Sequence, residues 1–139
     1  MSAESPPRQD ASPRLLHAML RVRDLQRSLE FYERHFGLRE QRRIAFPEIP
    51  RTLVFLASSG DDGSGMQLEL WHEPLGPVEA VSHNGHLGIG VHQIDELVAR
   101  LAAAGVPVTK SARALRSGGR RLAMITDPDG HELELLALD

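Results

Sequence analysis

The chain of 139 residues contains no cysteine, which excludes disulfide bonds, thiolate metal sites and cysteine nucleophiles. It also lacks any apolar stretch near the roughly 20 residues that a membrane-spanning helix requires. Its start, MSAESPPRQDASP, has neither the charged nor the apolar region of a secretory signal. A net charge of −3 without a long basic run does not indicate binding to nucleic acid or to a membrane. We therefore expect a soluble, cytoplasmic protein with a disordered tail over residues 1–13.

The same pattern occurs twice along the chain. It reads LHAMLRVRDLQRSLEFYERHFGL around His17 and GHLGIGVHQIDELVARLAAAGVPV around His86. In both copies a short alternating strand begins at the histidine, and an amphipathic helix follows. Gly37 and Gly105 then stand where a helix ends with a residue in the left-handed conformation. The pattern predicts two modules of one design, over residues 14–80 and 81–139.

Local signals predict the elements of each module. Asp24 is the predicted N-cap of the first helix. The apolar stripes are Leu25, Leu29, Tyr32 and Phe36 in the first helix and Leu97, Val98 and Leu101 in the second. Further strands are predicted over residues 52–57, 66–71, 121–126 and 131–137. The last two are joined by Asp127-Pro128-Asp129-Gly130, which has the composition of a tight turn.

A glutamate lies in the middle of the last strand of each module. Glu69 occurs in GMQLELW and Glu134 in GHELELL. Because strand side chains alternate between faces, both glutamates point away from the leucines beside them, which we expect to pack under the helices. If the modules meet about a pseudo-twofold axis, His17, Glu69, His86 and Glu134 converge on one point.

Imidazole and carboxylate groups suit nickel, cobalt, iron, manganese or zinc, and the absence of thiolate disfavours a purely structural zinc site. Four protein ligands leave two positions on an octahedral ion for water or substrate, whose oxygen the ion can polarise. A single strand glutamate or histidine is usually a solvated or packing residue, but matched positions in two repeats favour a metal site. The other histidines have no counterpart and are interpreted as surface residues, with His83 a reserve ligand: His35, His72, His83, His92 and His131.

The segments LHAMLRVRDLQRSLEFY, QLELW, GHLGIGV and DPDGHELELL resemble, in order and spacing, the vicinal oxygen chelate superfamily, and glyoxalase I (lactoylglutathione lyase) in particular. The resemblance covers residues 16–136. It implies an α+β fold of two βαβββ modules, shared with bleomycin-resistance proteins and dihydroxybiphenyl dioxygenases. It also implies a homodimer in which each metal site takes one module from each chain. The residues alone leave open whether the site forms across the dimer or within one chain.

The resemblance further implies a reaction. The hemithioacetal of methylglyoxal and glutathione, the co-substrate, would be isomerised to S-lactoylglutathione by proton transfer through a metal-bound enediolate. Glu134 would be the main proton carrier, with Glu69 as its counterpart. The short chain is similar to the class activated by Ni²⁺ or Co²⁺, and Zn²⁺ is possible. Such an enzyme serves methylglyoxal detoxification and needs neither nucleic acid nor membrane as a partner.

At the positions where the family binds the thiol, this chain matches the family pattern less well. Arg21 agrees with the family's arginine for a glutathione carboxylate, although a solvated strand arginine explains it equally. Arg116, in ALRSGGRR, takes the place of a lysine with a similar role. Glu73 stands where the family commonly has asparagine, and Ser82 where some members have arginine. A carboxylate at position 73 repels an anionic peptide unless it pairs with Arg21 or a nearby cation, so the preferred thiol stays open.

Other functions in the same superfamily are an extradiol dioxygenase, a thiol transferase, an acyl-CoA epimerase and a non-catalytic ligand-binding protein. The first two use three metal ligands, equivalent to His17, His86 and Glu134, and Glu69 argues against both. A binding protein typically lacks the four ligands. The epimerase is the closest alternative in chemistry, because it also moves a proton beside a metal-bound carbonyl.

Overall fold

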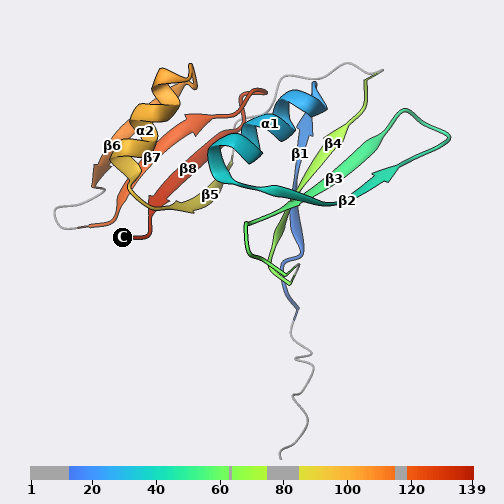
Figure 1. Cartoon of the computed structure of the whole chain (residues 1–139), viewed down its shortest axis with the longest axis horizontal. Coiled ribbons are helices and arrows are strands. Elements are labelled where there is room, and N and C mark those ends of the chain that lie inside the picture. The colour runs from blue at the N-terminus through green and yellow to red at the C-terminus, as the bar shows by residue number, and fades with distance from the viewer. Residues whose placement is uncertain (1–12, 63, 75–84, 115–118) are drawn as a thin grey trace, which may run out of the picture.

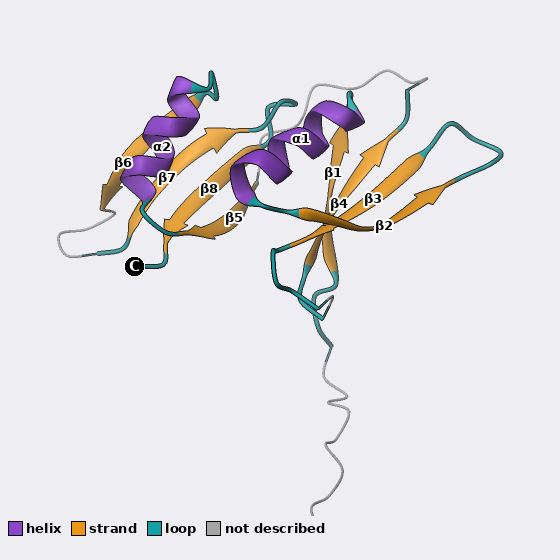
Figure 2. Cartoon of the chain, in the orientation of Figure 1, coloured by secondary structure: helices purple, strands orange, loops and turns teal. Residues whose placement is uncertain are grey.

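The computed structural model describes residues 13–62, 64–74, 85–114 and 119–139, and its elements form two βαβββ modules (Figure 1). The first module contains β1 (His17–Val22), α1 (Leu25–Phe36), β2 (Arg39–Ala45), β3 (Thr52–Ala57) and β4 (Gln67–His72). The second contains β5 (His86–Val91), α2 (Ile94–Ala103), β6 (Val108–Ala114), β7 (Arg121–Thr126) and β8 (Glu132–Ala137). In each module one helix lies along a four-stranded sheet (Figure 2). The predicted α+β class with two such modules is confirmed.

The first and last strands of each module are neighbours in its sheet. The strand orders are β1-β4-β3-β2 and β5-β8-β7-β6, with a parallel pair at β1/β4 and at β5/β8 and antiparallel pairs elsewhere. The strands predicted from alternation occur within one residue of their expected bounds. The sequence pattern gave no sign of β2, because this edge strand is exposed along its whole length and has no apolar face.

Short-range signals placed the ends of the helices correctly. The side chain of Asp24 accepts a hydrogen bond of 3.0 Å from the backbone N–H of Arg27, so it is the N-cap of α1. Gly37 ends that helix with φ of 66°, in the left-handed region. Gly105 follows α2 with φ of 85°. Glycine is favoured at both positions because it has no Cβ to clash there.

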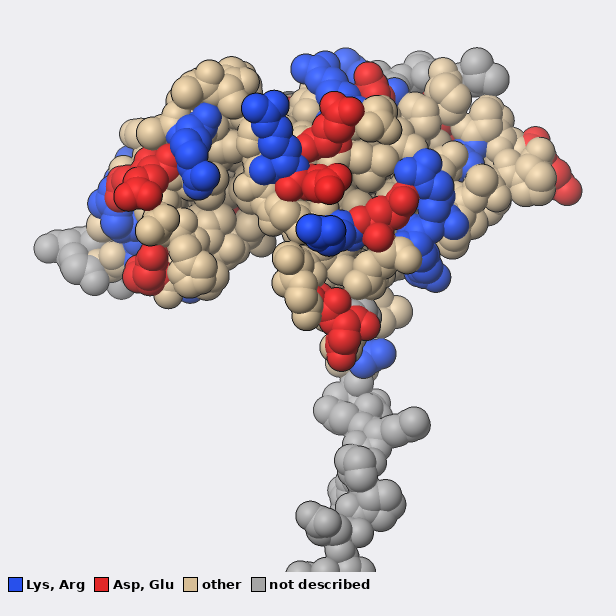
Figure 3. All heavy atoms as spheres, in the orientation of Figure 1, with Lys and Arg blue, Asp and Glu red and all other residues tan. Residues whose placement is uncertain are grey.

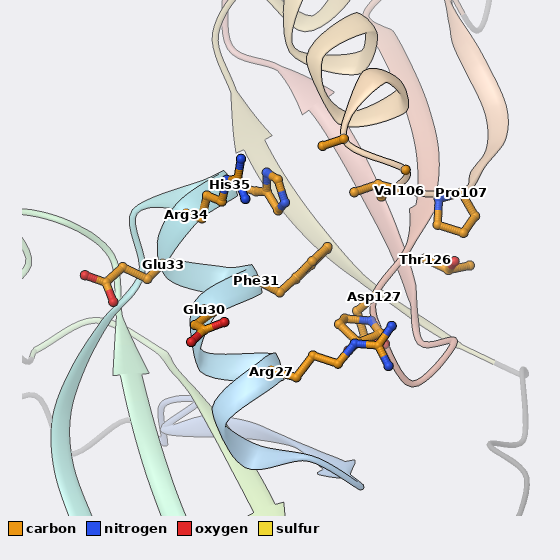
Figure 4. A pocket seen from close by; sticks show the side chains of 13 residues that line it. Arg27, Glu30, Phe31, Glu33, Arg34, His35, Val106, Pro107, Thr126 and Asp127 are labelled. Atoms are coloured by element: carbon orange, nitrogen blue, oxygen red, sulfur yellow. The ribbon is translucent and has the colours of Figure 1, made fainter.

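The core lies between each helix and its sheet. The strand leucines predicted to face the helices are buried: Leu68, Leu70, Leu133 and Leu135. Helix α1, however, is buried on a second side that its apolar stripe did not predict. Ser28 and Phe31 are buried as well, and Phe31 points across a cleft of about 660 Å³ toward Val106 and Thr126 of the second module (Figure 4). Helix α1 therefore packs against both modules.

Polar contacts also join the modules, at the turn between β7 and β8. The hydroxyl of Tyr32 donates a hydrogen bond of 2.6 Å to Oδ2 of Asp127, and both residues are buried. Burial raises the pKa of Tyr32, and the charge of Asp127 raises it further, so the phenol stays protonated. The other oxygen of Asp127 accepts the backbone N–H groups of Asp129 and His131. Asp127 thus stabilises the predicted turn and links that turn to α1 of the first module.

Positive and negative side chains are interspersed over the face seen in Figure 3. No helix in the described part of the chain is long and apolar enough to cross a membrane.

Replacing Tyr32 with phenylalanine should lower the free energy of unfolding by about 1–3 kcal/mol, because a buried carboxylate oxygen of Asp127 loses its donor. Urea unfolding followed by circular dichroism measures the change. The control is Glu30→Gln, which alters an exposed contact with Gln26 on the same helix and should cost less than about 0.5 kcal/mol. Equal stability of Tyr32→Phe and the parent chain would contradict the role given to this hydrogen bond.

Candidate metal and thiol site

The predicted ligands of the first module lie side by side on the sheet face away from α1. In the β1/β4 register Met19 is opposite Glu69, so His17 is the diagonal neighbour of that glutamate. His17 Nε2 lies 2.9 Å from Glu69 Oε2. Glu69 is only 6% exposed, and the Phe55 ring meets the His17 ring edge-on with centroids 5.5 Å apart. The position of this pair is therefore restricted by packing.

The second module repeats the pair in the same register. Gly88 is opposite Glu134 on β5/β8, and His86 Nε2 lies 3.7 Å from Glu134 Oε2. The Glu134 side chain is 24% exposed, against 7% for Glu69. Gly88 has no side chain at the position where Met19 stands beside Glu69. The second pair is therefore the more open of the two.

Within one chain the four predicted ligands form two separate pairs, His17 with Glu69 and His86 with Glu134. No group of three or more His, Cys, Asp or Glu side chains able to hold a metal occurs among the described residues. Each pair nevertheless fits a metal by its donors. Two ligands at right angles, each about 2.1 Å from an ion, lie about 3.0 Å apart, close to the separation of His17 and Glu69. Each pair supplies half of the expected ligand set.

A cleft of about 310 Å³ adjoins Glu134 on the same face of the second sheet. Its lining combines apolar strand residues with three basic ones, Lys110, Arg113 and Arg120. Arg116, the predicted thiol contact in this region, lies outside the described residues. The three cations that line the cleft were visible in the sequence, but without a strand assignment for β6 nothing indicated that they face Glu134.

Beyond the first pair, a charged cluster surrounds Trp71. The guanidinium carbons of Arg21 and Arg51 lie 5.5 Å and 4.3 Å from the centroid of its ring. Both Arg51 Nε and Trp71 Nε1 donate hydrogen bonds to Oε1 of Glu73, the second at 2.9 Å. The donation from Arg51, then that from Trp71, lowers the pKa of Glu73. Arg51 is thus the cation that Glu73 was expected to need, and the sequence alone did not identify it. Ser82 lies outside the described residues.

Comparison with known proteins agrees with this geometry. Residues 14–135, which span both modules and both His–Glu pairs, match the model of the Glyoxalase/Bleomycin resistance protein/Dioxygenase superfamily. The chain belongs to this superfamily. It is similar to the probable lactoylglutathione lyase of Vibrio cholerae, with 36% identity over 88% of this chain and 89% of the relative. It is also similar to the lactoylglutathione lyase of Haemophilus influenzae, with 36% identity over 88% and 90%.

Among solved structures of the superfamily, the chain resembles the trypanothione-dependent glyoxalase I of Leishmania major. The TM-score is 0.74 at 39% identity, over 91% of this chain and 87% of that one. Glyoxalase I of Zea mays gives a TM-score of 0.76 at 28% identity, over 88% of this chain and 44% of the longer maize chain.

Two histidines that the sequence analysis assigned to the surface have structural roles in this superfamily member. His131 is half-buried, and its Nε2 lies 2.7 Å from the carbonyl oxygen of Arg21 in the other module. His72 is half-buried too, with Nδ1 3.2 Å from the carbonyl oxygen of Val22. Both histidines therefore lie partly at the surface and also contact the backbone of β1, which no pattern within a single predicted element indicates. His83 is outside the described residues.

Proposed function

We propose that this chain is a metal-dependent lactoylglutathione lyase, which isomerises the hemithioacetal of methylglyoxal and glutathione to S-lactoylglutathione. The observation that carries the proposal is the His–Glu pair repeated in identical register, His17/Glu69 and His86/Glu134. The similar proteins of Vibrio cholerae and Haemophilus influenzae are named as lactoylglutathione lyases, which supports this reaction. Family membership does not fix the thiol, since the names include both lactoylglutathione and trypanothione.

We further propose that the complete site forms in a homodimer, where the first module of one chain faces the second module of its partner. The two pairs of one chain stay apart, so a second copy is needed to bring four ligands together. The pair-bearing face of the first sheet also exposes apolar side chains that a partner would cover. Met19 is 43% exposed and Ile44 is 37% exposed.

In that site His17, Glu69, His86 and Glu134 hold the ion, with Ni²⁺ or Co²⁺ favoured and Zn²⁺ possible. The ion supplies Lewis-acid polarisation of the substrate oxygens, which makes the adjacent C–H acidic. Glu134 takes that proton on a carboxylate oxygen and returns it to the neighbouring carbon, so the carboxylate is regenerated. Glu69 is the fixed ligand, because it is buried and lies close to His17.

The greater exposure of the second pair supports giving the proton transfer to Glu134. A proton carrier must reach two carbon atoms, and the Glu134 carboxylate, with a side chain 24% exposed against 7% for Glu69, is the more accessible of the two. The adjoining cleft offers Lys110 and Arg113 to the carboxylates of an anionic thiol. Arg21, on the first module, supplies a further cation for the same molecule.

The direct test is turnover after metal exchange. Chelated protein reloaded in turn with nickel, cobalt, zinc and iron is assayed with methylglyoxal and glutathione, and thioester formation is followed by ultraviolet absorbance. Nickel or cobalt should restore activity most strongly. If every ion binds and none yields thioester, the lyase assignment is wrong, and catechols and acyl-CoA substrates would be tested next.

Glu134→Gln should lower kcat by about 10²–10⁴-fold, because the amide cannot carry the proton. The variant should still bind metal through its remaining ligands, which metal analysis after gel filtration measures. The matched control is Glu132→Gln, two residues away on the same face of β8, which should keep near-normal turnover. His86→Ala should lose both metal and activity. Normal turnover in Glu134→Gln would exclude Glu134 as the proton carrier.

Mixing two inactive variants tests the shared site. A dimer of one His17→Ala chain and one His86→Ala chain has one site with both substitutions and one intact site, if each site spans the two chains. Random reassociation makes about half of the dimers mixed, so about a quarter of parental activity should return. A site within one chain predicts no recovery, because every chain then carries a defect.

A further inference from the structure

Two aspartates of the turn between β7 and β8 bind the first module. Oδ2 of Asp127 accepts a hydrogen bond of 2.6 Å from the Tyr32 hydroxyl. The two carboxylate oxygens of Asp129 accept hydrogen bonds from the backbone N–H of Arg23, at 3.0 Å, and from the Ser28 hydroxyl, at 3.4 Å. Tyr32 and Ser28 are fully buried, so water does not compete at their hydroxyl groups. The turn therefore holds the first half of α1 at several points.

A third residue of the same segment extends the contact to β1. His131 Nε2 lies 2.7 Å from the carbonyl oxygen of Arg21. We call the contacts of Asp127, Asp129 and His131 with the first module the clamp. Beside the clamp, a cleft of about 660 Å³ lies between α1 and the second module, so the helix meets that module along only part of its length. The clamp is the polar part of that meeting.

The connection between the modules does not itself keep the two His–Glu pairs apart. Residues 73–85 lie between the end of β4 and the start of β5. An extended chain of that length reaches roughly 40 Å. This reach permits the pair-bearing face of the first module to meet that of the second module in the same chain. Instead, the clamp holds the modules side by side (Figure 1), with their pairs separate.

Two assemblies therefore bring the four ligands together. A dimer with shared sites contains two complete sites and keeps both of its clamps. Two chains that each close on themselves also contain two complete sites, but neither keeps its clamp. Because the same faces meet in both assemblies, their contributions cancel, and the clamp is the contact that favours the dimer. Without it, the modules of one chain meet at an effective concentration on the order of millimolar, which favours closure within the chain.

We propose that the clamp directs each His–Glu pair to a partner chain and so makes the metal site a shared one. This inference rests on the proposed function for the four-ligand site. It adds that Asp127 and Asp129, which are not metal ligands, decide between a dimer and a monomer. A chain whose clamp is broken closes on itself and forms a monomer with one complete site.

The test uses Tyr32→Phe, Asp129→Ala and the variant with both substitutions. Their folding is checked by circular dichroism, and light scattering after gel filtration gives the mass of the nickel-loaded protein over a dilution series. Each hydrogen bond is lost twice in a dimer, so each single substitution should raise the dissociation constant of the dimer by about a hundredfold. The double variant should be a monomer at micromolar concentration and still hold one nickel ion per chain, as metal analysis measures.

Mixing of inactive chains gives a second result. His17→Ala and His86→Ala chains should restore no activity on mixing when both also carry the two clamp substitutions, because each closed chain keeps its own defect. The double variant with all four ligands intact should keep its activity per chain on dilution. The parent protein should lose activity on dilution below the dissociation constant of its dimer.

The matched control is Asp95→Ala, which removes an aspartate paired with Arg121 inside the second module. It should leave the dimer and the recovery of activity on mixing unchanged. Clamp variants that dimerise as tightly as the parent overturn the inference, as do variants that fall to monomers without nickel. If the double variant does not fold, the two single substitutions decide, since each is expected to weaken the dimer.

The mass and nickel measurements separate this inference from the proposed function. Nickel-loaded parent dimers and nickel-loaded monomers of the double variant, with no thioester formed by either, would support the clamp and refute the lyase. Thioester formation by clamp variants that stay dimers would refute the clamp and leave the lyase assignment intact.

Discussion

The candidate site depends on the parallel pairing of the first and last strands in each module. Strands β1 and β4 are separated by a helix and two further strands, yet they lie side by side, and β5 and β8 do the same. Because both pairs share one register, the histidine that begins the module and the glutamate near its end meet twice in the same way. Burial of the strand leucines under the helices keeps the pairs on the opposite face.

The two halves of the repeat differ in how tightly they hold their glutamate. Glu69 is buried, with Met19 opposite it on β1 and Phe55 opposite it on β3. Glu134 has Gly88 in the place of Met19 and is more exposed. A duplicated pattern therefore yields two carboxylates in different surroundings, one buried and one partly exposed. The two glutamates are the same residue type, so the difference comes from their neighbours, such as Met19 in one module and Gly88 in the other.

The contact between modules has consequences beyond stability. Asp127 binds Tyr32 of α1 and orders the turn that leads into β8, the strand of Glu134. His131, in the same region, contacts the backbone of Arg21 on β1. The turn that leads to Glu134 is thus attached to β1, the strand that carries Arg21. Within one chain, the relative orientation of the two pairs is restricted by these few polar contacts and by the packing of α1.

The sequence by itself determined the repeat, the ends of α1, the inward-facing leucines and the identity of both His–Glu pairs. These features follow from periodicity and from short-range signals such as the cap at Asp24, which depend on neighbouring residues alone. Tertiary structure decided the burial of Ser28 and Phe31, the roles of His72 and His131, and the partnership of Arg51 with Glu73. Each of these contacts joins residues distant in sequence or buries a face that local periodicity leaves polar, so no local pattern records them. The difference in openness between Glu69 and Glu134 belongs with them, because it arises from the strands packed alongside and not from the glutamates themselves.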